Sequence, residues 1–258
     1  MNKDKYEFHD LTLLITHYNR SSSLARLLST FKMQNCIFGD IVVSDDGSKP
    51  EHLSQLEKLQ SEYTFQLITT PVNKGLGNNI NKGQDAVKTP YTLYIQEDFL
   101  PVEDFALHLQ DAWDFMNERK ELDIVRFYAY YNYPYLIPFK NGYSEMKIPA
   151  IALNYTKIYF YSDHPHLRRS SFFEKFGRYA EGLKGDKTEY KMCISFIQKK
   201  GKGLFYNDFK GLFDQVNSEI EPSTMTRSSW TQSKNRLVKI VRDFYRQVKY
   251  NLDLKFSK

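Results

Sequence analysis

The chain has 258 residues, of which 41% are hydrophobic and 26% are charged, proportions that fit one large globular domain or two small ones. Its two cysteines, Cys36 and Cys193, form no CxxC pair, which argues against a disulfide framework or a zinc site. The net charge is +5, but residues 228–258 alone hold eight basic and two acidic residues, and the nearly neutral remainder argues against a nucleic-acid enzyme.

Strand and helix patterns alternate through the first half of the chain. Short runs rich in β-forming residues predict four strands, at residues 11–16, 40–44, 65–69 and 91–95. Apolar residues at helical spacing predict helices between them, at residues 24–31, 51–60, 77–87 and 104–115, with Ser21–Ser23 capping the first. This alternation predicts an α/β fold with a Rossmann-like, mostly parallel central sheet and helices on both faces.

Ligands of such sheets bind at the carboxyl ends of the strands. The residues that follow the four predicted strands are therefore the candidate site: 16–19, 45–48, 70–75 and 96–99. In the first two segments, a hydroxyl and an aromatic ring (Thr16, Tyr18) and two carboxylates (Asp45, Asp46) are groups that could hold a base and a ribose. Taken alone, each segment is also typical of an ordinary turn.

The fourth segment contains two adjacent carboxylates, Glu97 and Asp98, directly after an apolar strand. Carboxylate oxygens at such a position suit a divalent cation that bridges two phosphates. The sequence thus indicates a site for a nucleoside diphosphate.

Four pieces of this chain, in order, resemble family 2 glycosyltransferases of the GT-A fold. They are Thr-x-Tyr-Asn-Arg at 16–20, Ile-Val-Val-Ser-Asp-Asp-Gly-Ser at 41–48, the pair Asn73-Lys-Gly75 and Asn81-Lys-Gly83, and Tyr-Ile-Gln-Glu-Asp at 94–98. A weaker resemblance continues from 167 to 206, so that the similarity covers roughly residues 10 to 215.

The resemblance implies a role for each matching residue. Thr16, Tyr18 and Asp46 would bind the nucleoside, Asp98 would hold Mn²⁺ or Mg²⁺, and Glu189 would be the general base, with Asp186 as the alternative. The other expected contacts of the nucleotide sugar are Arg20, Asp45, Asn73, Gly75, Asn81, Gln96 and Glu97. Such enzymes invert the anomeric centre in one displacement, while the base removes the proton of the acceptor hydroxyl.

The chain departs from the family pattern at two points. Gln96 stands where the metal loop usually has its first aspartate, and residues 213–216 lack the histidine that often completes the metal site, with Asp214 as the nearest acidic substitute. These departures concern metal binding more than the fold.

Two further segments allow more than one interpretation. Residues 127–139 hold seven aromatics and form either a platform for the acceptor or a core strand with a tyrosine-rich loop. Arg168 and Arg169 could both pair with phosphates. The alternative is that one of the two is only a surface charge.

The end of the chain is predicted to form a basic amphipathic helix. We expect a transferase domain at residues 1–225 and a tail at 226–258, with Leu237, Val241, Phe244 and Val248 in one apolar stripe. The region 230–255 either contacts an anionic membrane surface or docks on the domain or on another subunit. With no apolar signal segment at the start and no run near the ~20 apolar residues of a membrane span, we expect a cytoplasmic protein at the inner face of the cell membrane.

The sequence therefore predicts an inverting transferase that moves a sugar from a nucleoside-diphosphate sugar, UDP-linked, to a hydroxyl of a saccharide or lipid-linked acceptor, in surface polysaccharide synthesis. A catalytically inactive sugar-nucleotide-binding protein of the same fold is the alternative. A nucleotidyltransferase is disfavoured, because the first strand is not followed by a glycine-rich phosphate loop.

Overall fold

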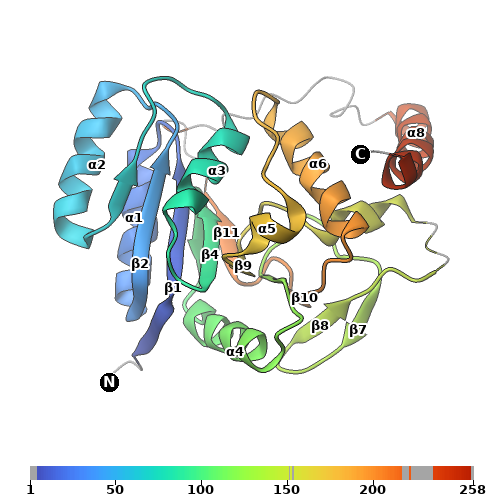
Figure 1. Cartoon of the computed structure of the whole chain (residues 1–258), viewed down its shortest axis with the longest axis horizontal. Helices are drawn as coiled ribbons and strands as arrows, with labels where there is room; N and C mark the ends of the chain where they lie inside the picture. Colours follow the sequence, from blue (N-terminus) through green and yellow to red (C-terminus); the bar gives the residue numbers. More distant parts are fainter. Residues whose placement is uncertain (1–4, 151, 153, 217–220, 222–234, 257–258) are drawn as a thin grey trace.

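The computed structural model describes residues 5–150, 152, 154–216, 221 and 235–256. Within them, nine strands form one sheet in the order β3-β2-β1-β4-β9-β6-β10-β8-β7 (Figure 1). Its first four strands are parallel neighbours and confirm the four predicted ones: β1 (Tyr6–His17), β2 (Cys36–Asp45), β3 (Gln66–Ile68) and β4 (Tyr91–Gln96).

The second half of the sheet is mixed. β9 (His166–Arg169) runs antiparallel between β4 and β6 (Ile124–Arg126), and β8 (Tyr143–Met146) runs antiparallel between β10 (Gly203–Tyr206) and β7 (Leu136–Pro138). β6 and β10 are parallel to each other, so only β9 and β8 oppose the common direction. β5 (Phe99–Pro101), which follows β4 in the chain, pairs antiparallel with β11 (Phe213–Gln215) in a separate two-stranded sheet.

Helices cover both faces of the sheet, as predicted. Alternate residues along β1 point to opposite faces: Leu13 and Ile15 belong to the apolar cluster that includes the inner sides of α1 (Ser21–Met33), α2 (Pro50–Tyr63) and α4 (Phe105–Glu118). Leu14 belongs to the other cluster, with α3 (Leu76–Ala86), η1 (Tyr155–Phe160), α5 (Phe172–Phe176) and α6 (Gly185–Gln198).

The start of α1 corrects one prediction. The serines do not cap the helix with their own side chains. Instead the carboxylate of Glu221 accepts hydrogen bonds from the backbone N–H groups of Ser22 (2.9 Å) and Ser23 (3.0 Å) and from the Ser23 hydroxyl (2.6 Å). A carboxylate satisfies two N–H groups at once and carries the charge that the positive end of a helix favours.

The C-terminal helix α8 (Arg236–Phe256) packs against η1 and α6 at the edge of the molecule, beyond α6 in Figure 1. The boundary predicted at 225/226 lies outside the described residues, so the domain division stays a prediction. Among the described residues, no helix combines the length and the apolar character needed to cross a lipid bilayer.

Candidate active site

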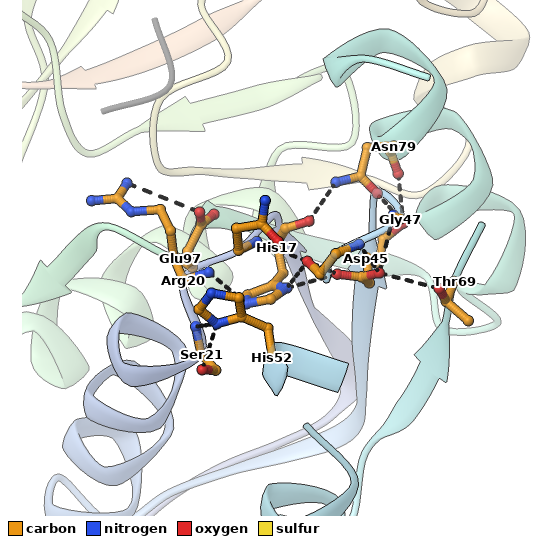
Figure 2. Close-up of polar contacts among 12 residues, drawn as sticks. His17, Arg20, Ser21, Asp45, Gly47, His52, Thr69, Asn79 and Glu97 are labelled. Atoms are coloured by element: carbon orange, nitrogen blue, oxygen red, sulfur yellow. Dashed lines mark hydrogen bonds and ion pairs between the residues drawn. The ribbon is translucent and has the colours of Figure 1, made fainter. Parts of the chain in front are cut away.

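Asp45 ends β2 and is completely buried under a set of hydrogen-bond donors (Figure 2). Its Oδ1 accepts from His17 Nδ1 (2.8 Å) and the Ser48 hydroxyl (2.5 Å), and its Oδ2 from the backbone N–H groups of Gly47 and Ser48 and from the Thr69 hydroxyl (3.1, 3.0 and 3.1 Å). His17 Nε2 accepts from the backbone N–H of Arg20, so its proton lies on Nδ1, facing Asp45. Asp45 therefore ties together the ends of β1, β2 and β3.

We call this set of hydrogen bonds to the Asp45 carboxylate the clamp, and it makes Asp45 important for the stability of the fold. Burial raises its pKa, but the hydrogen bonds from His17 and Ser48 outweigh burial and bring the pKa to about 2. A carboxylate with a lowered pKa stabilises the fold above the ordinary value of about 4, and this stability is lost as the pH falls towards 2.

Asp45→Ala should lower the free energy of unfolding by about 3 kcal/mol, because it leaves several buried donors without an acceptor. Urea denaturation at neutral pH measures this change, with the exposed Asp85→Ala as the control. A loss below about 0.5 kcal/mol, the range of an ordinary surface substitution, would contradict the clamp.

Asp46 holds the Asn-Lys-Gly turn. Its two carboxylate oxygens accept from the backbone N–H groups of Lys74 and Gly75, both at 2.8 Å. The turn lies close: a Cβ on Gly47 would come within 2.5 Å of the backbone of Val72, and Gly47 has a φ of +70°, so glycine is required there. Burial raises the pKa of Asp46.

Two asparagines of α3 anchor this helix. Asn79, which sequence reasoning missed, donates from Nδ2 to the His17 carbonyl (3.2 Å) and accepts from the Ser44 hydroxyl (2.8 Å). Asn81 exchanges hydrogen bonds with the backbone of Tyr179 and donates to Glu181. Both side chains are buried and satisfied within the protein.

The expected nucleoside contacts lie at the same edge of the sheet. Thr16 is buried, and its hydroxyl lies 3.1 Å from that of Tyr94 inside the sheet. Tyr18 is half-buried, just beyond the end of β1. Asn73 accepts from Gly75 N–H within its turn. As contacts of a nucleotide, Thr16, Asp45 and Asn81 stay predictions; what the structure shows for them is a supporting role.

At the end of β4, Arg20 pairs with the two adjacent carboxylates. Its Nη1 lies 3.2 Å from Asp98 Oδ2 and 3.9 Å from Glu97 Oε1, and Figure 2 shows the guanidinium beside Glu97. All three side chains are nearly buried. Burial and the neighbouring Asp98 raise the pKa of Glu97 to about 8, against the opposing effect of Arg20.

On β11, Gln215 rather than Asp214 contacts the cluster formed by Arg20, Glu97 and Asp98. Gln215 Nε2 donates to Asp98 Oδ2 (2.9 Å), and its Oε1 accepts from the Tyr130 hydroxyl (2.9 Å). Asp214, the substitute expected from the sequence, is exposed on the same strand. Alternation along a strand explains the difference, since neighbouring residues point to opposite sides.

Whether a cation can bind at this edge together with a diphosphate depends on the carboxylates present there. No group of three or more His, Cys, Asp or Glu side chains able to hold a metal occurs in the described part of the chain. Mg²⁺ commonly uses only one or two protein carboxylates together with substrate phosphates and water. Asp98 and, once ionised, Glu97 would offer that number, with Gln96 as a neutral neighbour; both acidic side chains lie next to Arg20 in this structure.

Glu189 lies on α6 next to a second acidic residue, Asp163. The backbone N–H of Asp163 donates to Glu189 Oε1 (3.2 Å), and the two carboxyl groups share a hydrogen bond. Burial and the Glu189 carboxylate raise the pKa of Asp163 well above its ordinary value. A raised pKa favours the protonated form of Asp163, which can donate a hydrogen bond to Glu189. Asp186 is exposed in the first turn of α6.

Gln96 connects this acidic pair to the end of β4. Its Nε2 donates to the Asp163 carbonyl (3.2 Å). Sequence reasoning missed Asp163, although it stands in the polar run Ser-Asp-His just before β9. The Gln96 side chain thus links the strand end that carries Glu97 and Asp98 to the loop that contacts Glu189.

Neither Arg168 nor Arg169 is a surface charge. Arg168 is completely buried, donates to Gln84 (2.7 Å) and lies over the rings of Tyr94, Phe172 and Phe173. Arg169 donates to the backbone carbonyls of Met116, Arg119 and Leu122. The aromatic segment 127–139 is mostly core, with Tyr131 as its most exposed ring.

Comparison with known proteins is consistent with this arrangement. Residues 12–177 match the family model described as Glycosyl transferase family 2. No curated protein sequence matches the chain.

Solved structures of low sequence identity share the fold. A structure of TarS 1–349 from S. aureus aligns with a TM-score of 0.60 and 18% identity, over 79% of this chain and 59% of that one. Its complex with UDP-GlcNAc gives 0.62 and 16%, over 96% and 72%. The mannosyltransferase PcManGT from Pyrobaculum calidifontis, in complex with GDP-Man and Mn²⁺, gives 0.57 and 11%, over 93% and 64%. This chain therefore spans less than two thirds of the first TarS structure and of PcManGT.

Proposed function

Since the chain belongs to glycosyl transferase family 2, we propose that it is an inverting glycosyltransferase. Its donor would be a nucleoside-diphosphate sugar, UDP-linked, and its acceptor a hydroxyl of a saccharide or lipid-linked molecule in surface polysaccharide synthesis. One observation carries the proposal: Gln96 at the end of β4 contacts Asp163, which contacts Glu189 on α6. This connection supports the proposal, because it links the proposed base to the strand end that carries the carboxylates proposed to hold the metal ion.

Glu189 is the proposed base. Its carboxylate accepts the proton of the acceptor hydroxyl as that oxygen attacks the anomeric carbon, and the sugar–diphosphate bond breaks in the same step. Asp163 orients Glu189 through its hydrogen bonds. Asp98, with Glu97 beside it, would hold Mn²⁺ or Mg²⁺, which when bound neutralises charge on the departing diphosphate. Tyr18 and Asp46 are the proposed nucleoside contacts, beside the turn of Asn73 and Gly75.

The choice of donor rests on the relatives. One TarS structure is a complex with UDP-GlcNAc, which supports a UDP-linked donor. PcManGT is a complex with GDP-Man and Mn²⁺, which makes a GDP-linked donor the alternative. A lipid-linked acceptor would place the reaction at the cytoplasmic face of a membrane.

The pH dependence of kcat/KM should report the Glu189–Asp163 pair. Burial raises the pKa of Glu189, and the hydrogen bond from Asp163 lowers it. Since the base acts only when ionised, kcat/KM should rise with pH through a pKa above the ordinary glutamate value. Asp163→Ala removes the donor and should move this rise upward by about one pH unit, whereas Asp163→Asn, which keeps a donor, should stay near wild type. Identical pH profiles for Asp163→Ala and wild type would show that the pair does not tune the base.

A catalytically inactive nucleotide-sugar-binding protein remains the alternative, favoured by the contacts that Arg20 and Gln215 make with Asp98. Release of nucleoside diphosphate separates the two. A panel of UDP-, GDP-, TDP- and CDP-sugars is incubated with the protein, Mn²⁺ and simple saccharide acceptors. Release of one diphosphate that Glu189→Gln abolishes supports the transferase; binding of a donor without any release, in the presence or absence of acceptors, supports the binding protein.

A further inference from the structure

The C-terminal helix α8 docks on the body through polar contacts and through Tyr250 and Leu254, which pack against the apolar core. The Tyr155 hydroxyl donates to Asp243 (3.1 Å), and the Tyr190 hydroxyl donates to Asp253 (2.7 Å). The Tyr250 ring lies against Tyr155 and Tyr190, with ring centroids 5.9 and 4.9 Å apart. Both acidic residues of the helix are therefore engaged on the docked side.

The other side of α8 is apolar and faces away from the body. At 3.6 residues per turn, six large side chains gather there, and each is between 45% and 71% exposed. We call them the outward stripe: Val241, Phe244, Tyr245, Val248, Leu252 and Phe256. An exposed apolar stripe of this length marks an interaction surface.

Positive charge accompanies the outward stripe. α8 holds six basic and two acidic residues, and the two acids bond to tyrosines of the body. Lys239 and Lys255 are exposed near the two ends of the helix, and Arg242 lies half-buried along it. Lys249 instead pairs with Asp253 on the docked side. A partner of this surface must therefore accept apolar side chains and carry negative charge.

We propose that the outward stripe binds the surface of an anionic lipid bilayer. Apolar side chains of such a helix enter the boundary between headgroups and acyl chains, while lysine and arginine side chains meet lipid phosphates. A second copy of the chain fits less well, because two stripes face to face would bring like charges together.

The docked side relates this surface to the active site. Tyr190, which binds Asp253 of α8, directly follows Glu189 on α6. Bound to a membrane, α8 would hold the Glu189 end of the site near the lipid surface, where a lipid-linked acceptor would be presented. This last step rests on the proposed function; lipid binding itself does not.

Vesicle flotation tests the proposal with the full chain. Vesicles of phosphatidylcholine alone are compared with vesicles that also contain phosphatidylglycerol. Wild type should float with the anionic vesicles, and less so in high salt. Phe244→Ser/Leu252→Ser should weaken this binding by about a hundredfold, roughly tenfold for each apolar side chain lost. The control Met33→Ser/Leu107→Ser, which alters equally exposed apolar residues of α1 and α4, should bind like wild type.

Three results would overturn the proposal: no flotation of wild type, equal flotation of the double variant, or a wild-type dimer in light scattering that Phe244→Ser/Leu252→Ser converts to a monomer. The last would identify the stripe as a subunit interface. Donor binding, measured without vesicles, should be unchanged in the double variant. A failure of lipid binding is therefore distinguishable from a failure of the transferase proposal.

Discussion

Glu189→Gln should lower kcat by about a thousandfold, the middle of the range for loss of a general base. Glutamine keeps the shape of the side chain and accepts from the Asp163 N–H through its carbonyl, but it takes no proton from the acceptor. Donor affinity should stay within about twofold, because Glu189 belongs to the acceptor side of the proposed reaction. Steady-state release of nucleoside diphosphate gives kcat, and calorimetric titration gives the donor affinity.

Asp186→Asn is the matched control for this variant. Asp186 lies on the same helix and was the other candidate base, but its side chain is exposed. Glu189 lies about one helical turn after Asp186 and is the residue that Asp163 contacts. We expect Asp186→Asn to keep kcat within about twofold of wild type. A thousandfold loss in Asp186→Asn with an active Glu189→Gln would reverse the assignment.

Asp98→Asn should lower kcat/KM by about a hundredfold, as expected when one charged group that stabilises the leaving diphosphate is lost. The Mn²⁺ dependence of the remaining activity should weaken as well. The melting temperature without ligands must be compared in parallel, because Asp98 also pairs with Arg20. Asp214→Asn is the control: its side chain is exposed on the same strand as Gln215, and we expect wild-type activity. Unchanged kcat/KM in a folded Asp98→Asn would remove Asp98 from the donor site.

The sequence predicted the fold where short-range patterns decide it. The apolar run before Asp45 and the helical spacing of Leu24, Leu27 and Leu28 each fix an element locally, and parallel strands then bring their carboxyl ends together. The candidate site at residues 45–48 and 96–98 followed from this rule alone.

Long-range contacts were beyond the same reasoning. Glu221 caps α1 across about two hundred residues, and Asp163 reaches Glu189 from a loop before β9. No local pattern links such partners. Gln215 rather than Asp214 contacts Asp98, because the two residues point to opposite sides of β11. Which side faces Asp98 depends on the pairing of β11 with β5. For α8, the sequence predicted an apolar stripe, but the tyrosine contacts of Asp243 and Asp253 and the exposure of the stripe show which side faces outward.

Thermal unfolding with UDP, GDP, TDP and CDP, each with and without Mn²⁺, tests the donor site most directly. A ligand that binds only the folded state raises the melting temperature, by about 5 °C or more at a hundredfold excess over its dissociation constant. We predict a rise with one nucleotide, UDP, that depends on Mn²⁺ and is lost in Asp98→Asn. No rise with any of the four nucleotides would contradict a nucleotide-sugar site at this edge of the sheet.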